Sequence, residues 1–91
     1  MNPIVIEILS KPGQDCDQME KTISWAASKL NLPIKIKKTS NFGLYTHISV
    51  NPAQSPIVII DGQVEFAKIT PQVEVVLRRL AEIRDRRGGA S

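Results

Sequence analysis

The chain has 91 residues, a mass of 10.1 kDa and a net charge of +3, from 12 basic and 9 acidic residues. This length supports one domain with a small core. With the single cysteine Cys16, the chain cannot form an internal disulfide or a metal site built from several cysteines. Its longest wholly apolar run, Ile57–Ile60, is far too short to cross a bilayer.

The excess of positive charge lies near the end of the chain, in the arginine-rich residues 78–87. Such a segment can contact an acidic partner, a nucleic acid or an anionic membrane, or it can be a solvated helix face. Aromatic residues make up only 4% of the chain, so we do not expect nucleic-acid binding. We also expect no membrane association. Because the N-terminal residues lack the basic region of a secretory signal, we expect a cytoplasmic protein.

The first half of the chain predicts a strand, a helix and a second strand. Residues 4–9 are almost all apolar and β-branched, as in a strand buried on both faces. Residues 34–37 alternate between apolar and charged, which is typical of a strand with one buried face or of an edge strand. Between them, Asp15 or Asp17 is a candidate cap for a helix. One face of that helix carries an apolar stripe: Met19, Ile23, Ala26, Ala27 and Leu30.

The second half predicts a weak helix and a β-hairpin. Residues 41–48 favour a short helix that Gly43 weakens, with four side chains available to pack on the sheet: Phe42, Leu44, Tyr45 and Ile48. Residues 57–60 and 63–66 predict two strands, and the Asp61-Gly62 pair between them predicts a tight turn, because both turn positions need positive φ.

The chain ends with a predicted helix. Thr70 is its expected cap and Pro71 its first residue, where a missing amide hydrogen costs nothing. Its apolar stripe comprises Val73, Val76, Leu77, Leu80 and Ile83. The predicted fold is therefore α/β with the order βαβαββα and a four-stranded mixed sheet flanked by helices on both faces. We expect one domain over residues 1–87 and a flexible tail over residues 88–91.

Two short motifs stand out: residues 12–20, PGQDCDQME, after the first predicted strand, and residues 55–62, SPIVIIDG, around the third. Together with the element order, they resemble thioredoxin-fold proteins, most closely the small, glutaredoxin-sized redox proteins of bacteria and archaea. Residues 12–20 stand where that family has a C-x-x-C motif followed closely by a Met-Glu or Leu-Glu pair. Residues 55–62, SPIVIIDG, stand where it has a Thr-Pro or similar dipeptide before the third strand and an Asp-Gly or Asn-Gly turn after it. The resemblance covers about residues 4–83.

The chain departs from this family at the first cysteine. If Cys16 takes the place of the second cysteine, the first falls at Gly13. The resemblance implies that the first cysteine is the attacking thiolate and that the second resolves the mixed disulfide. With glycine at the position of the first cysteine, the chain cannot cycle between a dithiol and a disulfide. We therefore expect no conventional dithiol–disulfide oxidoreductase, and whether the protein is an enzyme of another kind stays open.

Cys16 has two interpretations. A position near a helix N-terminus stabilises a thiolate, and this favours a monothiol reaction such as formation of a glutathione adduct. Against it, the neighbouring charges of Asp15 and Asp17 disfavour a thiolate. Cys16 also lies three residues before Met19 on the apolar stripe, as a cysteine with a packing role does. Packing is the favoured interpretation, and glutathione is the one co-substrate that this chemistry suggests.

The Ser55-Pro56 pair leads to a second hypothesis. The resemblance implies that this peptide bond is cis, that Pro56 packs against the loop that contains Pro12 and Gly13, and that the backbone of Ser55 is free to pair with an extended peptide. The alternative is a trans proline that begins a strand. On this hypothesis the protein is a non-catalytic module that binds a protein or peptide at Ser55, Pro56, Pro12 and Gly13.

The other polar and aromatic residues point to no further chemistry. His47 has no cysteine or histidine at metal-ligand spacing, so we expect no metal site. Trp25 lies off the apolar stripe of its helix, where packing is favoured over a contact surface. A third hypothesis is an adaptor whose arginine-rich last helix docks on an acidic surface. Nothing in the sequence indicates the oligomeric state.

Overall fold

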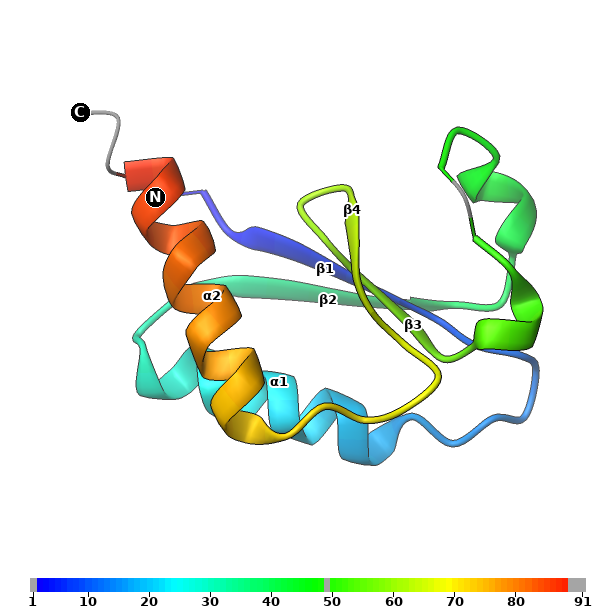
Figure 1. The fold of residues 1–91 in the computed structure, drawn as a ribbon, viewed down its shortest axis with the longest axis horizontal. Helices are drawn as coiled ribbons and strands as arrows, with labels where there is room; N and C mark the ends of the chain where they lie inside the picture. Colours follow the sequence, from blue (N-terminus) through cyan, green and yellow to red (C-terminus); the bar gives the residue numbers. More distant parts are fainter. Residues whose placement is uncertain (1, 49, 89–91) are drawn as a thin grey trace.

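The computed structural model describes residues 2–48 and 50–88 and has a four-stranded mixed sheet with two α-helices (Figure 1). The strand order is β2-β1-β3-β4, with β1 parallel to β2 and antiparallel to β3, and with β3 antiparallel to β4. This confirms the predicted α/β class and mixed sheet. The elements are β1 (Ile4–Leu9), α1 (Asp17–Lys29), β2 (Ile34–Thr39), the 3₁₀ turns η1 (Phe42–Tyr45) and η2 (Pro52–Gln54), β3 (Ile57–Ile60), β4 (Gln63–Ala67) and α2 (Val73–Gly88).

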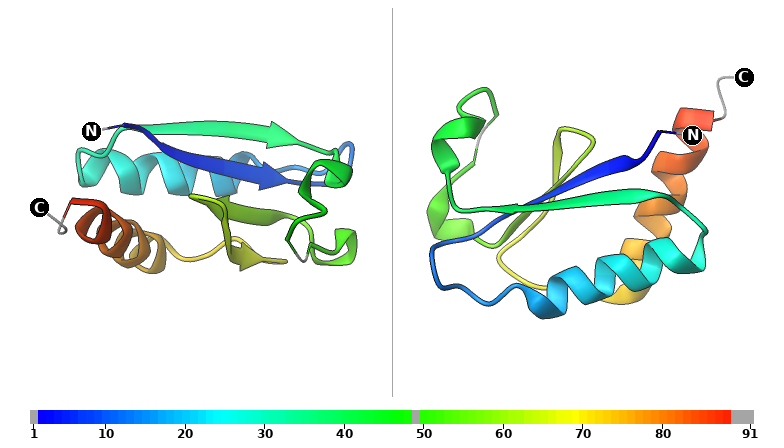
Figure 2. Two further views of the ribbon diagram at one scale, coloured as in Figure 1. Left: turned by 90° about the horizontal axis from the view of Figure 1, so that it is seen from above. Right: turned by 180° about the vertical axis from the view of Figure 1, so that it is seen from behind.

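Both α-helices pack on the same face of the sheet. Their buried residues form one core with the alternate residues of β1 and β3 that point to that face, among them Ile6, Ile8 and Val58. The predicted stripes are confirmed, since Met19, Ile23, Val76, Leu80 and Ile83 are all fully buried. The expectation of helices on both faces is wrong. In the described part of the chain, the second face is covered by the segment that contains η1 and η2, at the end of the sheet away from the start of β1 (Figures 1 and 2).

Within residues 41–48, a 3₁₀ turn over Phe42–Tyr45 replaces the predicted short helix. Asn41 is the N-cap of this turn, and its side chain accepts a hydrogen bond from the backbone N–H of Gly43 at 3.1 Å. Gly43 lies inside the turn and disfavours its extension into a regular helix. The segment still packs on the sheet as predicted, through Phe42, Tyr45 and Ile48. Leu44 was expected to join them, but its side chain is 63% exposed.

The hairpin turn agrees with the sequence-based prediction, whereas the final helix begins later than predicted. Asp61 and Gly62 both have positive φ, +50° and +83°, as the tight turn requires. The final helix begins at Val73, two residues later than predicted. Its first helical hydrogen bond runs from the N–H of Val76 to the carbonyl of Gln72, at 3.2 Å, so Gln72 is the residue just before the helix. Thr70 and Pro71 belong to the connection from β4. Gly88 continues α2, and residues 89–91 of the predicted tail lie outside the described residues.

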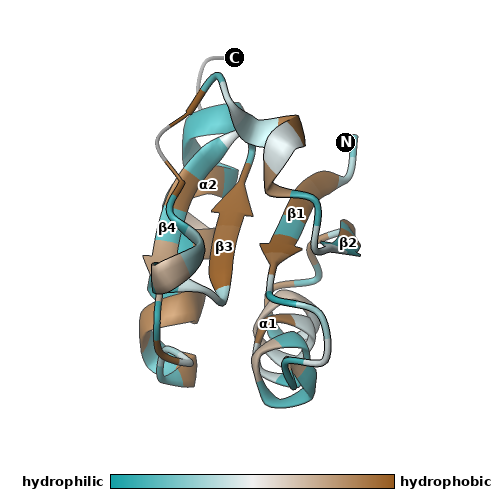
Figure 3. Cartoon of the chain, turned by 90° about the vertical axis from the view of Figure 1, so that its right-hand side faces the viewer, coloured by the Kyte–Doolittle hydropathy of each residue, from teal (hydrophilic) through white to brown (hydrophobic). Residues whose placement is uncertain are grey.

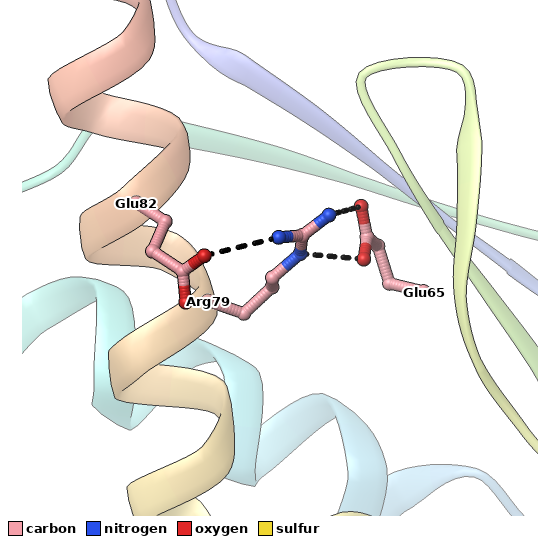
Figure 4. A network of polar contacts seen from close by, with 3 residues as sticks. All are labelled: Glu65, Arg79 and Glu82. Atoms are coloured by element: carbon pink, nitrogen blue, oxygen red, sulfur yellow. Dashed lines mark hydrogen bonds and ion pairs between the residues drawn. The ribbon is translucent and has the colours of Figure 1, made fainter.

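A charged network ties α2 to the hairpin (Figure 4). The guanidinium of Arg79 donates two hydrogen bonds to the carboxylate of Glu65, at 2.6 and 3.0 Å, and a third to Glu82 at 3.2 Å. In β4, Val64 and Phe66 pair with consecutive residues of β3, so Glu65 is the extra residue of a β-bulge. Its carboxylate therefore reaches α2, and this bidentate contact holds the helix over the edge of the sheet.

Two leucines in different surroundings test this description of the core. Leu80 is fully buried, whereas Leu44 is 63% exposed. We expect Leu80→Ala to lower the free energy of unfolding by about 2–5 kcal/mol, because it removes apolar contacts and leaves a cavity. Leu44→Ala should change it by less than about 0.5 kcal/mol. Urea denaturation followed by circular dichroism measures both, and equal effects would contradict the assignment of the core.

Candidate functional site

The loop after β1 and the segment before β3 meet at one end of the sheet (Figure 1). Gln14 connects them: its side-chain Nε2 donates a hydrogen bond to the carbonyl of Ser55 at 3.3 Å. The other end of the same carboxamide, Oε1, accepts the backbone N–H of Lys11 at 3.0 Å. The backbone N–H of Gln14 donates to the carbonyl of Lys11, also at 3.0 Å. The loop is thus folded on itself and held against Ser55.

The Ser55–Pro56 peptide bond is cis, as the sequence resemblance implies. The backbone of Ser55, however, is not free. Its N–H donates to the carbonyl of Pro52 at 3.2 Å, within the turn η2, and its carbonyl accepts the hydrogen bond from Gln14. The expectation of an unoccupied backbone is therefore wrong for this conformation. A peptide strand at Ser55 would have to displace the carboxamide of Gln14.

The hydroxyl of Ser55 is unusual. Among the residues that the structure describes, its Oγ is the one buried side-chain oxygen or nitrogen without a hydrogen-bond partner. An unpaired buried polar group costs roughly 1–3 kcal/mol. This oxygen therefore gains a partner if a ligand or a rearranged loop reaches it, and it lies on the same residue as the carbonyl that Gln14 occupies.

Pro12 and Gly13 lie in the turn of the loop, and both are exposed. Gly13 has a φ of +81°, in the left-handed region that favours glycine, and a Cβ added there would meet no atom within 4 Å. The local turn thus explains the glycine at this position, and a cysteine side chain there would have room on a strained backbone. The hydrogen bond to Ser55 comes from Gln14, which the sequence analysis did not single out.

Cys16 stands directly before α1, at its N-cap position, and its side chain makes no capping hydrogen bond. The residue is 7% exposed and belongs to the core under the two helices. This placement favours the packing interpretation. Neither Asp15 nor Asp17 is the cap residue that the capping-box spacing predicted. Instead, Cys16 occupies the cap position. The carboxylate of Asp15, the residue before it, accepts a hydrogen bond from the backbone N–H of Asp17 at 2.9 Å.

Lys38 places a positive charge over the first turn of α1. Its Nζ lies 2.9 Å from Oε2 of Glu20. The hydrogen bond and the charge of Glu20 raise the pKa of Lys38, and the nearby Asp17 and Cys16 add smaller effects in the same direction. The sequence analysis missed this residue. The signal was available, because Lys38 shares strand parity with Ile34 and Ile36 and so points to the helix side of β2.

On the other face of the sheet, the hydroxyl of Tyr45 donates a short hydrogen bond to Oε2 of Glu7, which fixes η1 on β1. Burial, together with this hydrogen bond and the negative charge of Glu7, raises the pKa of Tyr45 to about 12. The ring of His47 lies 6.3 Å from that of Tyr45, centroid to centroid. In the described ranges, no group of three or more histidine, cysteine or acidic side chains is arranged to hold a metal ion.

The remaining candidates lie on the surface away from this end of the sheet. Trp25 is 48% exposed and does not pack inside, and Nζ of Lys29 lies 5.1 Å from its ring centroid. Of the arginines near the end of α2, Arg84 contacts Asp85, and Arg87 donates to the carbonyl of Asn2. These contacts are those of a solvated helix surface.

No protein-family model matches this sequence, and no curated protein or solved structure matches it significantly. Within residues 2–48 and 50–88, neither helix combines the length and the apolar character of a membrane-spanning segment.

The environment of Tyr45 gives a pH-dependent signal. Tyr45 is the one tyrosine of the chain, so phenolate absorbance reports this residue. We expect its titration midpoint near 12 in the folded protein and near the ordinary value of about 10 in guanidinium chloride. Because the folded state holds the proton more tightly, this contribution to stability is complete below about pH 10 and is lost as the pH rises towards 12.

Glu7→Gln should lower the folded-state midpoint, since it removes the negative charge and keeps an acceptor for the hydroxyl. Glu74→Gln, an exposed change on α2, is the matched control. Equal midpoints in the folded and unfolded wild-type chains would contradict the contact between Tyr45 and Glu7.

The burial of Cys16 predicts slow modification. We expect iodoacetamide to alkylate Cys16 in the folded protein at least about tenfold more slowly than in the urea-unfolded chain, because the sulfur must first be exposed by local opening. Mass spectrometry of quenched samples measures both rates across the pH range. Alkylation of the folded protein faster than that of the unfolded chain would contradict the packing interpretation and support a reactive thiol.

Proposed function

We propose that this chain is a thioredoxin-like protein of redox-family origin that binds an extended peptide or protein segment at Ser55–Pro56 and carries out no dithiol exchange. The sheet supports the fold assignment through a parallel β1–β2 pair followed by an antiparallel β3–β4 hairpin. The order of α1, the hairpin and α2 along the chain agrees with it as well. The fold differs from the βαβαββα pattern in having 3₁₀ turns where the second helix is expected.

The observation that carries the binding proposal is the state of Ser55. Its carbonyl is held by one side-chain hydrogen bond at 3.3 Å, near the upper limit for such a bond, and its buried hydroxyl has no partner among the described residues. The backbone N–H of a peptide strand can replace the carboxamide of Gln14 at this carbonyl. Such an exchange conserves the hydrogen bond and frees the glutamine side chain to solvent. Pro12 and Gly13, in the exposed turn of the loop, would border the bound strand.

The proposed absence of dithiol exchange rests on the cysteine content. A single thiol cannot form or resolve an intramolecular disulfide. A glutathione-linked reaction of Cys16 is the second candidate, which the N-cap position and the nearby charge of Lys38 favour. The surroundings of the sulfur oppose it, because Cys16 is only 7% exposed and lies within an apolar core. A free thiol also suits the cytoplasmic location that we propose.

Peptide selection followed by variant binding tests this proposal. Random peptides displayed on phage are selected on the immobilised full chain, and the enriched peptides are synthesised with a fluorescent label. We expect Gln14→Ala to bind such a peptide about two- to tenfold more tightly than the wild type, because the peptide no longer competes with the glutamine for the Ser55 carbonyl. Fluorescence anisotropy measures the dissociation constants.

Gln18→Ala is the matched control, since Gln18 is an exposed glutamine on α1 and the side-chain hydrogen bond to Ser55 comes from Gln14. The bound peptide should also shift the amide NMR signals of Ser55 and Ile57. Failure to enrich any peptide, or enriched peptides that bind both glutamine variants equally and shift signals elsewhere, would overturn the proposal.

A further inference from the structure

The two edges of the sheet are protected very differently. β2 and β4 are the outer strands. β2 carries Lys35, Lys37 and Lys38, and lysines on an edge strand oppose pairing with another chain. Within β4 the one charged residue is Glu65, whose side chain is 8% exposed and bound by Arg79. The edge formed by β4 is only five residues long and has a bulge at Glu65, but in contrast to β2 it carries no lysine and no unpaired charge on the strand itself.

Apolar surface surrounds the β4 edge on both faces of the sheet. Three of the exposed large hydrophobic side chains lie on or beside this strand: Val64 and Val75, each 42% exposed, and Ile69, 73% exposed. Val64 pairs with Ile59 and so points away from the helices, whereas Val75 is on α2. A cavity of about 560 Å³ lies between β4 and the start of α2, and its lining includes Phe66, Ile69, Pro71 and Val75. A further strand paired with the outer edge of β4 would therefore cover apolar side chains on both faces of the sheet.

The charges at the two ends of β4 have opposite signs. Asp61 precedes the strand and Lys68 follows it. An extended chain rises about 3.3 Å per residue, so these two side chains are roughly 20 Å apart within one molecule. Lys68 makes no ion pair with any residue that the structure describes, and the contact of Asp61 with Nε of Arg87 is long, at 3.6 Å. Antiparallel pairing of two copies of β4 would bring each Lys68 next to the Asp61 of the other copy.

We propose that β4 pairs antiparallel with β4 of a second copy of this chain, which joins the two sheets in a two-fold symmetric dimer. The residues that flank the strand, Asp61 and Lys68, are complementary in charge between two antiparallel copies, and exposed apolar residues lie on or beside the strand. Two-fold interfaces of this kind use the same patch on both subunits. The pairing uses the outer edge of β4 and does not depend on peptide binding at Ser55.

Sedimentation equilibrium of the full chain tests this dimer. Over about a hundredfold range of concentration, we expect the mean mass to rise from 10.1 kDa towards twice that value. Val64→Lys and Ile69→Asp should each weaken the dimer at least about tenfold, because they place a charge in the apolar border of the edge. Leu44→Asp is the matched control, since the exposed fraction of Leu44, 63%, lies between those of Val64 and Ile69 and the residue is on η1; it should leave the dissociation constant unchanged.

A charge exchange tests the antiparallel direction. Lys68→Glu and Asp61→Lys should each weaken self-association. The dimer has two symmetry-related contacts between residues 61 and 68, and either variant places like charges at both of them. An equimolar mixture of the two variants should form the dimer again, since every pair then has opposite charges. Asp61→Asn, which suits the positive φ of the turn, is a second variant in case Asp61→Lys disturbs the hairpin, and it should weaken the dimer without a charge reversal.

Three results would overturn the proposal. A mass of 10.1 kDa across the whole concentration range excludes the dimer. A dimer that Leu44→Asp disrupts and that Val64→Lys and Ile69→Asp leave intact uses another surface. Failure of the mixed charge variants to associate excludes the antiparallel register. None of these results affects peptide binding at Ser55, which is measured with different variants.

Discussion

The structure depends on one constraint, the burial of β1 and β3 on both faces. All four residues of β3 are buried, as are Ile4, Ile6, Ile8 and Leu9 of β1. Figure 3 shows β3 as a continuous hydrophobic strand in the middle of the sheet. Two central strands of this kind need cover on each side. The two α-helices cover one face, and the other is left to the short segment between β2 and β3.

This second cover explains where the candidate site lies. The chain must return from the end of β2 to the start of β3, and residues 40–48 pack over the neighbouring end of the sheet through Tyr45 and Phe42. The hydrogen bond from Tyr45 to Glu7 fixes them there. The last residues before β3 then reach the loop after β1, and Gln14 contacts Ser55. The same need for cover that builds the second core thus brings together two loops that are distant in sequence.

Burial also decides which groups are accessible. Cys16 is part of the core between the first turn of α1 and the sheet. The same packing that fills the core with this side chain shields its thiol from solvent. The edge of β4 is the opposite case: the bulge that turns Glu65 towards Arg79 takes the charge away from the edge. One polar contact therefore secures α2 and at the same time leaves an apolar border exposed. The proposed peptide site and the proposed dimer edge are separate consequences of the same small core.

The sequence by itself determined the strands, both helices and the tight turn at Asp61-Gly62, because periodicity and turn chemistry are local. It also indicated the cis bond before Pro56, through a resemblance and not through physics. Only the tertiary structure decided that both helices share one face and that Gln14, 41 residues away in sequence, holds the carbonyl of Ser55. The start of α2 and the exposure of Leu44 were likewise visible only in the structure. Such features depend on contacts between residues that are distant in sequence and come together only in the folded chain. A local sequence pattern does not specify these contacts.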